Sequence, residues 1–448
     1  MTKTDYRFLK FASFFRATNW SAVVPVIMAS AFDESCNAKL SSVIKRVKDT
    51  VTIENDKQYT RITIRQYGQG VIARDMVLGN TIGTKRQFLA TGGQLIVSGI
   101  DARNGSIGIV PEELTGAIVT NDFWLFDIAD TVVPQYLFML LSAERFQQYW
   151  QSKSSGTTNR QRINQNDLLA MEIPLPDLAT QHRIVDKYNV TNTEAKHNEK
   201  LAKQFEDSID NVLFQELGIE EVTNKMKSKS NYTFLKLSKL SKINRWDVWN
   251  RNERFISTKY DFQAFETVVN DKPLYGANEK AVRNTSGVRY IRITDINEDG
   301  SLNDDIVSAQ TIEDKYLLKE NDFLIARSGN TVGKTFLYKD SMGKAIFAGY
   351  LVKYVLNGEK VFPEYILHYT KSRIFKDWIA NNQRIFGQPN INGQEYLKAS
   401  IIVPPIEIQK TIANKILAIR EQVKAHRQKA TSLRALAKKQ FEEDIFGE

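Results

Sequence analysis

The chain has 448 residues, which is enough for two to four domains that each bury a core of their own. A hydrophobic content of 42% and a charged content of 25% are typical of a folded globular protein and exclude a disordered chain. The formal net charge of +9 favours a polyanionic partner such as a nucleic acid, but many basic proteins bind nothing acidic, so the charge needs support from other features.

The scarce residue types narrow the class further. The single cysteine, Cys36, has no internal partner for a disulfide, and four histidines leave little material for a metal site. Cys36 is best interpreted as a small residue in a reducing compartment. The longest apolar run, residues 22–31, contains Pro25 and is too short to cross a bilayer, and the mixed residues before it are not typical of a signal peptide. We therefore expect a cytoplasmic protein.

In the first half of the chain, short strands are expected to precede a helix. Polar and β-branched residues alternate in three expected strands, and a fourth, aromatic segment is typical of a buried strand; these are Tyr59–Arg65, Gln94–Ser98, Gly116–Thr120 and Phe123–Phe126. A helix is predicted from Pro134 to about Trp150, because proline suits a first helical turn and Tyr136, Leu137, Leu140 and Leu141 share one face.

A characteristic phrase closes this half and leads into a long helix. Ile163-Asn164-Gln165-Asn166-Asp167-Leu168-Leu169 is followed by Ile173-Pro174-Leu175-Pro176 and then by Gln181. Residues 178–217 carry apolar side chains at spacings near three and four, as a coiled-coil seam requires. Thr191-Asn192-Thr193 are poor helix formers and predict a bend or an interruption. The polar, lysine-rich residues 220–232 after this helix are the best domain boundary in the chain.

The second half repeats this order. Val288–Thr294 is expected to be a strand that ends in a polar turn, Asp295–Gly300, and further strands are expected at Asp322–Ala326 and Ala345–Gly349. Pro363–Leu367 begins a helix that parallels Pro134–Phe138.

The phrase itself then returns. Ile391-Asn392-Gly393-Gln394-Glu395-Tyr396-Leu397 leads into Val403-Pro404-Pro405 and Gln409, and a second long helix is expected over residues 407–445. A repeat of half the chain excludes a solenoid, whose period is about 20–50 residues. It predicts two similar modules and, if they bind a ligand, a ligand with two parts.

The two long segments leave one structural alternative open. Their seams suit pairing as a coiled coil over a length on the order of 60 Å, but two separate helices that each cover their own module would show a similar pattern. Residues 410–439 also hold nine basic side chains against Glu421 alone. That charge is typical of a solvated helix face, and it would equally suit phosphate or an acidic partner subunit.

One segment imitates a nucleotide-binding loop. Gly329-Asn330-Thr331-Val332-Gly333-Lys334-Thr335 follows an apolar run, but only three residues separate its glycines where a phosphate-binding loop has four. Because such a loop wraps its N–H groups around a phosphate of constant size, a glycine-rich turn is the better interpretation. Dinucleotide, zinc-protease, paired-cysteine, hydrolase-elbow and amino-methyltransferase motifs are missing from the sequence, which favours a binding protein.

Basic and amide side chains occur on the expected strand ends and turns of both halves. Arginine and lysine can pair with guanine, asparagine and glutamine with adenine, and all can hold phosphate, although most such residues are ordinary surface groups. The candidates for DNA contact in the first half are Arg61, Arg65, Arg74, Lys85, Arg86, Arg103, Asn159, Arg160 and Arg162. Those in the second half are Arg251, Arg254, Arg289, Arg292, Arg327, Lys334, Arg384 and Gln388.

Together these features resemble the specificity subunit of type I restriction-modification systems. The resemblance rests on Tyr290–Ile296 with Gly300, on Asn321–Gly329 with Gly333, and on two proline-rich strands followed by Gln181 and Gln409. It covers nearly the whole chain. The first half departs from the pattern, since Val97-Ser98-Gly99-Ile100-Asp101 stands where the second has Ala326-Arg327-Ser328-Gly329. Such a divergence suits a family whose two modules read different sequences.

The resemblance implies an α+β fold with two similar, strand-rich target-recognition domains, separated by two long helices that pack as an antiparallel coiled coil and give a pseudo-two-fold repeat. The expected recognition domains are residues 1–177 and 220–406, and the expected helical regions are residues 178–219 and 407–448. Each recognition domain would read one half of a bipartite, asymmetric duplex DNA target. The helices would set the spacer and dock two methyltransferase subunits.

The resemblance also implies that catalysis belongs to partners. The methyltransferase subunits would carry S-adenosylmethionine and methylate adenine, and restriction subunits would bring ATP and Mg²⁺. The chain itself would then hold no catalytic residue, cofactor or metal.

Two other classes of function stay open on the residues alone. An NTP-dependent enzyme would use Lys334 and Thr335, and nucleotide binding by the isolated chain that is lost in Lys334→Ala would favour it. A coiled-coil interaction protein without a DNA role is the other, and a purified complex that retains no duplex would favour that. A specificity subunit of a related methylation-based defence system is a close variant of the leading hypothesis.

Overall fold

The structure, a computed structural model, describes seven segments of the chain. These are residues 30–65, 70–100, 105–153, 163–221, 254–283, 287–384 and 388–447. Among these residues, no helix combines the length and the apolar character that crossing a bilayer requires. The chain divides into two compact units, which we call unit 1 (residues 1–198 and 429–448) and unit 2 (residues 199–428).

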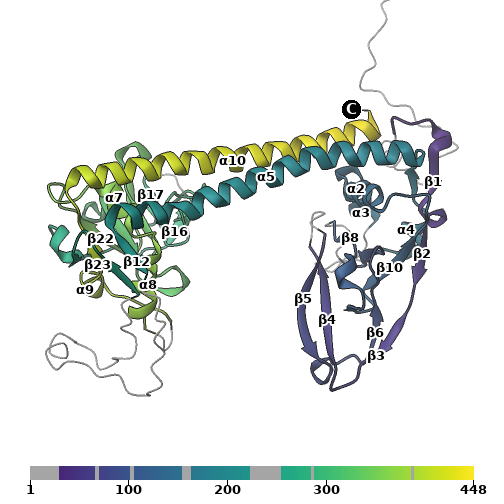
Figure 1. Cartoon of the computed structure of the whole chain (residues 1–448), viewed down its shortest axis with the longest axis horizontal. Helices are drawn as coiled ribbons and strands as arrows, with labels where there is room; N and C mark the ends of the chain where they lie inside the picture. Colours follow the sequence, from purple (N-terminus) through teal and green to yellow (C-terminus); the bar gives the residue numbers. More distant parts are fainter. Residues whose placement is uncertain are drawn as a thin grey trace, which may run out of the picture. The chain divides into compact units, whose positions relative to one another are not determined.

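Unit 1 is built on two sheets. A four-stranded sheet has the order β2-β10-β7-β8, and a five-stranded sheet has the order β3-β6-β9-β4-β5 (Figure 1). The strands are β1 (Asn37–Lys39), β2 (Ile44–Val47), β3 (Thr50–Thr52), β4 (Gln58–Ile64), β5 (Val71–Leu78), β6 (Arg86–Leu89), β7 (Leu95–Ser98), β8 (Ile107–Ile109), β9 (Ile118–Val119), β10 (Phe123–Ile128) and β11 (Glu172–Pro174). Its short helices are α2 (Pro134–Ser142), α3 (Glu144–Lys153) and α4 (Gln165–Leu169).

Unit 2 contains a second four-stranded sheet, in the order β15-β22-β19-β20, and several two-stranded ladders. The strands of this half are β12 (Ile219–Glu221), β13 (Phe255–Ser257), β14 (Phe262–Ala264), β15 (Leu274–Tyr275), β16 (Ala281–Arg283), β17 (Arg289–Ile291), β18 (Val307–Ala309), β19 (Asp322–Ala326), β20 (Thr335–Leu337), β21 (Ala345–Phe347), β22 (Leu351–Val355) and β23 (Ser400–Ile402). Its short helices are α7 (Pro363–Tyr369), α8 (Arg373–Asn382) and α9 (Gly393–Tyr396).

The two four-stranded sheets are copies of one another. Leu95 of β7 pairs with Phe126 of β10, and Phe323 of β19 pairs with Tyr354 of β22, all in antiparallel register. All four side chains are fully buried, and β7 and β19 are buried at every position, as expected for short apolar strands that are covered on both faces. The internal repeat predicted from the sequence is therefore confirmed in the fold.

The repeated phrase has a structural role at each copy. Its asparagine caps a short helix: the Asn164 side chain accepts the N–H of Asn166, and the Asn392 side chain accepts those of Gln394 and Glu395. Asparagine is favoured at this position because it satisfies N–H groups that a helix start leaves unpaired. The proline-rich segments that follow pair as β11 with β1 and as β23 with β14.

A buried glutamine near the start of each long helix then binds the segment that precedes α2 in unit 1 or α7 in unit 2. Gln181 accepts the N–H of Val133 at 2.8 Å and donates to the carbonyls of Thr131 and Pro176. Gln409 makes the same three contacts in unit 2, with Phe362, Lys360 and Pro404. Both glutamines are fully buried. Each buried amide therefore satisfies three backbone groups, one N–H and two carbonyls.

Gln409→Leu should destabilise unit 2. Leucine resembles the amide in size but leaves the Phe362 N–H and two carbonyls unpaired, at a cost on the order of 3 kcal/mol. Denaturant unfolding of the full chain should show the transition of unit 2 at lower denaturant, and Gln181→Leu should do the same for unit 1. Gln394→Ala, at an exposed position of the same phrase, is the matched control. Unchanged midpoints in the two leucine variants would contradict this role.

The long helices are α5 (Leu178–Leu217) and α10 (Ile406–Phe446). In unit 1 the ring of Tyr188 contacts that of Phe441 at 6.4 Å between centroids. In unit 2, Phe205 stacks on His426, and Glu216 pairs with Lys415. As residue numbers rise along α5, those of the contacting residues on α10 fall. In each unit the two helices therefore lie antiparallel and side by side (Figure 1).

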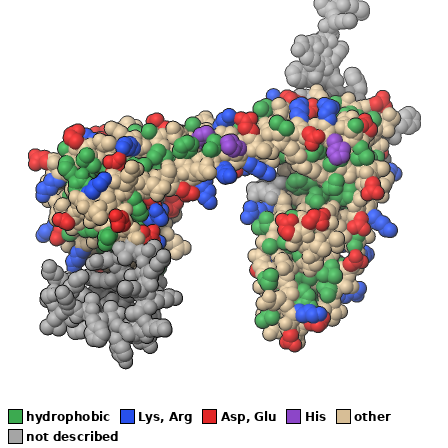
Figure 2. Space-filling view, in the orientation of Figure 1, with side chains coloured by type: hydrophobic (Ala, Val, Ile, Leu, Met, Phe, Trp, Pro, Cys, Tyr) green, Lys and Arg blue, Asp and Glu red, His purple; other side chains and the backbone are tan. Residues whose placement is uncertain are grey.

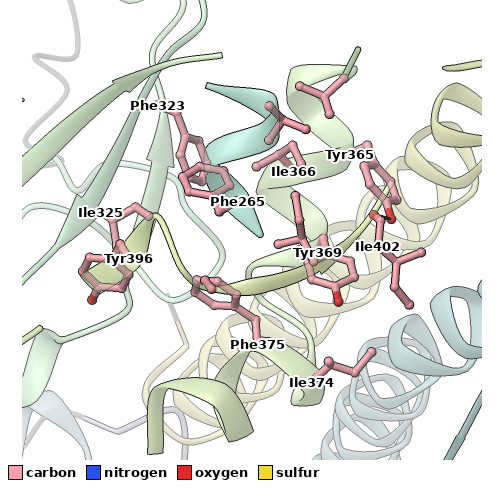
Figure 3. Packing of buried hydrophobic residues seen from close by; sticks show 14 of the residues in the cluster. Phe265, Phe323, Ile325, Tyr365, Ile366, Tyr369, Ile374, Phe375, Tyr396 and Ile402 are labelled. Atoms are coloured by element: carbon pink, nitrogen blue, oxygen red, sulfur yellow. Dashed lines mark hydrogen bonds between the residues drawn. The ribbon is translucent and has the colours of Figure 1, made fainter. Parts of the chain in front are cut away.

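Each long helix contributes to both cores. Unit 1 buries Ile184 of α5 together with Phe441 and Ile445 of α10, and unit 2 buries Leu213 and Leu217 of α5 with Ile412 and Ile416 of α10. The alternative that each helix covers only its own module is therefore wrong. Figure 3 shows aromatic side chains in the core of unit 2, among them Phe323 of β19, Tyr365 of α7 and Phe375 of α8.

Four local predictions differ from the structure. The predicted helix 134–150 breaks at Ala143, which has extended backbone and whose carbonyl accepts the N–H groups of Phe146 and Gln147, because the turn there carries Phe146 into the core. The predicted strand 288–294 ends at Ile291, because the carboxylate of Asp295 binds the N–H of Arg292 and closes a turn. Two other predicted strands are shorter than expected, since Gly116–Thr120 reduces to β9 and Ala345–Gly349 to β21.

Two predictions about the connection between the halves had different outcomes. α5 runs without interruption through Thr191-Asn192-Thr193, where Thr191 meets Gln440 of α10, so the predicted interruption is wrong and the pairing of the helices outweighs weak helix propensity. The predicted linker, residues 220–232, begins inside β12, which pairs with β13, and the rest of it lies outside the described residues.

Candidate nucleic-acid interface

The predicted contact residues of unit 1 cluster around the β4–β5 hairpin and the start of β6. Arg61 of β4 binds Asp75 of β5 through two hydrogen bonds, from Nε at 2.7 Å and from Nη2 at 2.6 Å. These bonds lower the pKa of the Asp75 carboxyl. Arg74 reaches the same carboxylate at 3.4 Å. Both arginines line a cavity of about 210 Å³ whose walls include Gln87 and Thr120.

The other predicted residues of unit 1 are more loosely held. Lys85 donates to Asn55 and to the carbonyl of Gly79, both at 2.8 Å. Arg65, directly after β4, and Arg86, at the start of β6, are exposed. Arg103, Asn159, Arg160 and Arg162 lie outside the described residues, as does Arg251 of the second half.

Most of the predicted residues of unit 2 are paired with acids. Arg254 binds Glu221 at 2.7 Å and approaches Asp377 at 3.5 Å, and Arg384 binds Glu395 at 3.3 Å. Arg292 bridges the fully buried Asp295 and the exposed Asp305, and the bond to Asp295 raises its pKa. The more exposed pairs of Arg254 and Arg384 add less than about 1 kcal/mol of stability each, so a phosphate could replace these carboxylates at little energetic cost.

Of the other described candidates in unit 2, Arg289, Arg327 and Gln388 have no carboxylate partner. Arg289 of β17 donates to the carbonyl of Asn303 at 2.6 Å. Arg327, directly after β19, lies between the rings of Tyr275 and Tyr350. Gln388 is exposed, and its side-chain amide lies close to Gly329. A Cβ atom added to Gly329 would be 3.2 Å from the amide nitrogen of Gln388. The sequence reasoning missed both tyrosines, because their exposure depends on how β15 and β22 pair.

Positive and negative side chains are interspersed on the face of each unit shown in Figure 2. The basic residues of α10 follow the same pattern: Lys415 and Arg427 pair with Glu216 and Glu206 of α5 in unit 2, and Lys429 pairs with Glu194 in unit 1. Acidic side chains of α5 therefore neutralise part of the positive charge that was predicted for α10.

The glycine-rich segment does not have the geometry of a phosphate-binding loop. Strand β20 follows it where such a loop needs the start of a helix. The N–H of Gly333 donates to Ala326, and that of Lys334 to Thr331, so these groups do not converge on a ligand. The Lys334 ammonium binds the carbonyl of Ile296 and the carboxylate of Glu298.

The cavity beside this segment is small, and the Lys371 ammonium at its wall is already hydrogen-bonded to backbone carbonyls. It measures about 130 Å³, and Lys334, Thr335 and Lys371 are among its lining residues. Burial lowers the pKa of Lys371 to about 7, and its ammonium donates to the carbonyls of Glu298 and Thr335. The NTP-dependent alternative is therefore not favoured.

Matching hydrogen bonds establish which positions of the two units correspond. Gly99 donates to the carbonyl of Asp122 and accepts the N–H of Ile163, and Arg327 makes the same two bonds with Tyr350 and Ile391. Because Ile163 and Ile391 begin the two copies of the repeated phrase, Gly99 corresponds to Arg327.

This arrangement defines a class: a tandem-module protein whose two units share a frame and differ in side chain at a corresponding position, Gly99 in unit 1 and Arg327 in unit 2. A family model described as the type I restriction modification DNA specificity domain matches residues 40–216 and again residues 269–434. The chain therefore belongs to this family, as the sequence resemblance predicted. No curated protein sequence matches the chain.

One of three similar solved structures shares the fold at a TM-score above 0.5. A chain from a study of complex assembly and conformational transition of the type I R-M system is 14% identical, covers 91% of this chain and 96% of its own, and superposes with a TM-score of 0.56. The HsdS subunit from Thermoanaerobacter tengcongensis is 15% identical over 92% and 96% of the two chains, with a TM-score of 0.40. A Type-I restriction-modification S subunit from M. genitalium is 12% identical over 91% and 95%, with a TM-score of 0.43. Only the first supports a common fold.

Proposed function

We propose that the chain is the DNA sequence-recognition subunit of a type I restriction-modification complex that acts in the cytoplasm. The recognition domains are residues 1–177 and 220–406, and each reads one half of a bipartite, asymmetric duplex. The helical regions, residues 178–219 and 407–448, set the unread spacer and dock two methyltransferase subunits. Those subunits bring S-adenosylmethionine, and restriction subunits that use ATP and Mg²⁺ join them.

One observation carries this proposal: the two units repeat the four-stranded sheet and matching hydrogen bonds around it, while a corresponding position has a different side chain in each unit. At corresponding positions unit 1 has Gly99 and unit 2 has Arg327, each with the same backbone hydrogen bonds. A frame that serves both units suits a ligand whose backbone is the same in both halves, and divergent side chains suit base edges that differ. Duplex DNA with a two-part sequence has both properties.

The binding properties of the chain with and without its partners test this function. The full chain alone should bind duplex weakly, and its affinity should fall steeply with salt because phosphate contacts release counterions. With methyltransferase subunits added, a split site should be bound about 10³-fold or more tightly than random duplex. The site is obtained by mapping methylated bases in cells that carry the complex. A complex that binds split and random duplexes equally would contradict the proposal.

A further inference from the structure

The guanidinium of Arg327 is fixed in position, but its two terminal nitrogens make no hydrogen bond to the described residues. Its guanidinium carbon lies 5.0 Å from the ring centre of Tyr275 and 6.0 Å from that of Tyr350. Its Nε donates to the carbonyl of Gly349 at 3.1 Å. The two terminal nitrogens have no hydrogen-bond or carboxylate partner among the residues that the structure describes. The planar fork is therefore oriented before any ligand arrives, which reduces the entropy lost on binding.

This state distinguishes Arg327 from five of the other predicted arginines. Arg61, Arg74, Arg254, Arg292 and Arg384 each bind a carboxylate that a ligand would have to displace. Arg65, Arg86 and Arg289 also bind no carboxylate among the described residues, but Arg327 is in addition held between two tyrosine rings. Arg327 needs no such exchange. Its charge is stabilised by aromatic faces, which attract a guanidinium without occupying its N–H groups.

The surroundings of Arg327 form an exposed recognition surface. Tyr350 is 54% exposed and Tyr275 is 40% exposed, although the Tyr275 hydroxyl is anchored by the N–H of Gly393 at 2.9 Å. The amide of Gln388 lies over Gly329, two residues beyond Arg327. Gly329 has a φ of 71°, a backbone conformation that glycine adopts readily, so this turn holds its shape without strain.

Unit 1 has no side chain at the corresponding position. Gly99 repeats the backbone bonds of Arg327, but a Cβ there would lie 2.9 Å from Cζ2 of Trp124. The indole thus fills the space that a longer side chain would enter. A phosphate contact would serve both units alike, since both face the same DNA backbone, whereas a base contact has reason to differ.

We propose that Arg327 reads a guanine, through its O6 and N7 in the major groove, within the half-site that unit 2 recognises. The fork of Arg327 presents two N–H groups side by side, and guanine is the base that presents two acceptors to match them. This inference rests on the proposed function and adds to it a residue and the base that it reads. It also requires that the half-site of unit 2 contain at least one G·C pair.

The test uses the full chain co-expressed with its methyltransferase subunits. Methylated bases are mapped for the wild type, Arg327→Ala, Arg327→Lys and Lys360→Ala. Lys360 is an exposed lysine whose ammonium binds the carbonyl of Thr267, away from this surface, and it controls for the loss of one positive charge. The half read by unit 2 is the one that persists when residues 1–177 are exchanged.

Arg327→Ala should relax one G·C position in that half by roughly 5- to 150-fold in preference and leave the other half unchanged. Arg327→Lys should relax the same position, because lysine keeps the charge but not the fork. Lys360→Ala should match the wild type. If the variants methylate too little to map, affinities of the purified complexes decide, and Arg327→Ala should bind cognate duplex and duplex with that pair replaced equally well.

Several outcomes would overturn the assignment. These are an unchanged motif, relaxation at an A·T pair or in the other half, and a uniform loss of affinity with a salt slope reduced by about one, which would mark a phosphate contact. A wild-type complex that shows no two-part motif would instead refute the proposed function. The two failures are therefore distinguishable.

Discussion

Exchange of residues 1–177 for the first recognition module of another family member is expected to change one half of the methylated sequence completely and to leave the other half intact. The exchange replaces the β4–β5 hairpin and the cavity between Arg61 and Arg74, but it retains Arg327 and all of unit 2. Base contacts that differ at several positions change affinity by about 1–3 kcal/mol each, so the old half-site should no longer be methylated.

Mapping of methylated bases measures this directly. The junction falls before α5, so the buried contacts of Gln181 must be retained in the hybrid, and the donor module should supply the Val133 and Thr131 backbone positions that Gln181 binds. The reciprocal hybrid, in which residues 220–406 are exchanged, is the matched control and should change the other half only. A hybrid in which both halves changed, or neither, would show that the two units do not read independently.

Insertion of four residues into α5 after Asn198, with four more into α10 before Lys429, is expected to lengthen the spacer by about two base pairs. Four helical residues add about 6 Å along the helix axis, and one base pair occupies about 3.4 Å of duplex. Both half-sites should keep their sequences, because the strands and turns of each unit are untouched.

The control for this experiment is the same insertion in α5 alone. It shifts one helix against the other and breaks the pairing of Glu216 with Lys415 or of Lys187 with Asp444, so it should weaken binding instead of yielding a new spacer. The spacer is again obtained from mapped methylation and from affinities for duplexes of graded length. A double insertion that retained the original spacer would show that the helices do not determine it.

The long helices and the repeat were predictable because their signals are local and long. An apolar seam at spacings of three and four over some forty residues identified α5 and α10 to within about a residue at each end. The capping asparagines and the proline-rich strands marked the two copies of the phrase, since each works through neighbours in the chain. The strand Asp322–Ala326 matched its prediction because an apolar run between turn residues has few other uses.

The sequence could propose candidate contact residues by their type, but it could not predict which of them are paired with carboxylates. The sequence singled out Arg61 and Arg292 together with Arg327, yet the first two bind carboxylates from a neighbouring strand or turn and the third does not. Pairing of Arg61 with Asp75 depends on the register of a hairpin that contains a bulge between Arg61 and Ile62. No local pattern encodes that register in full.

The sequence by itself determined the doubled architecture, the two long helices and the family, because periodicity, capping and repeat are properties of residues close together in the chain. Only the tertiary structure decided that Gly99 corresponds to Arg327, that Gln181 and Gln409 each satisfy three backbone groups, and that each long helix enters both cores. The physical reason is that these relations join residues far apart in sequence. Burial and hydrogen bonding select them only when the strands and helices have packed.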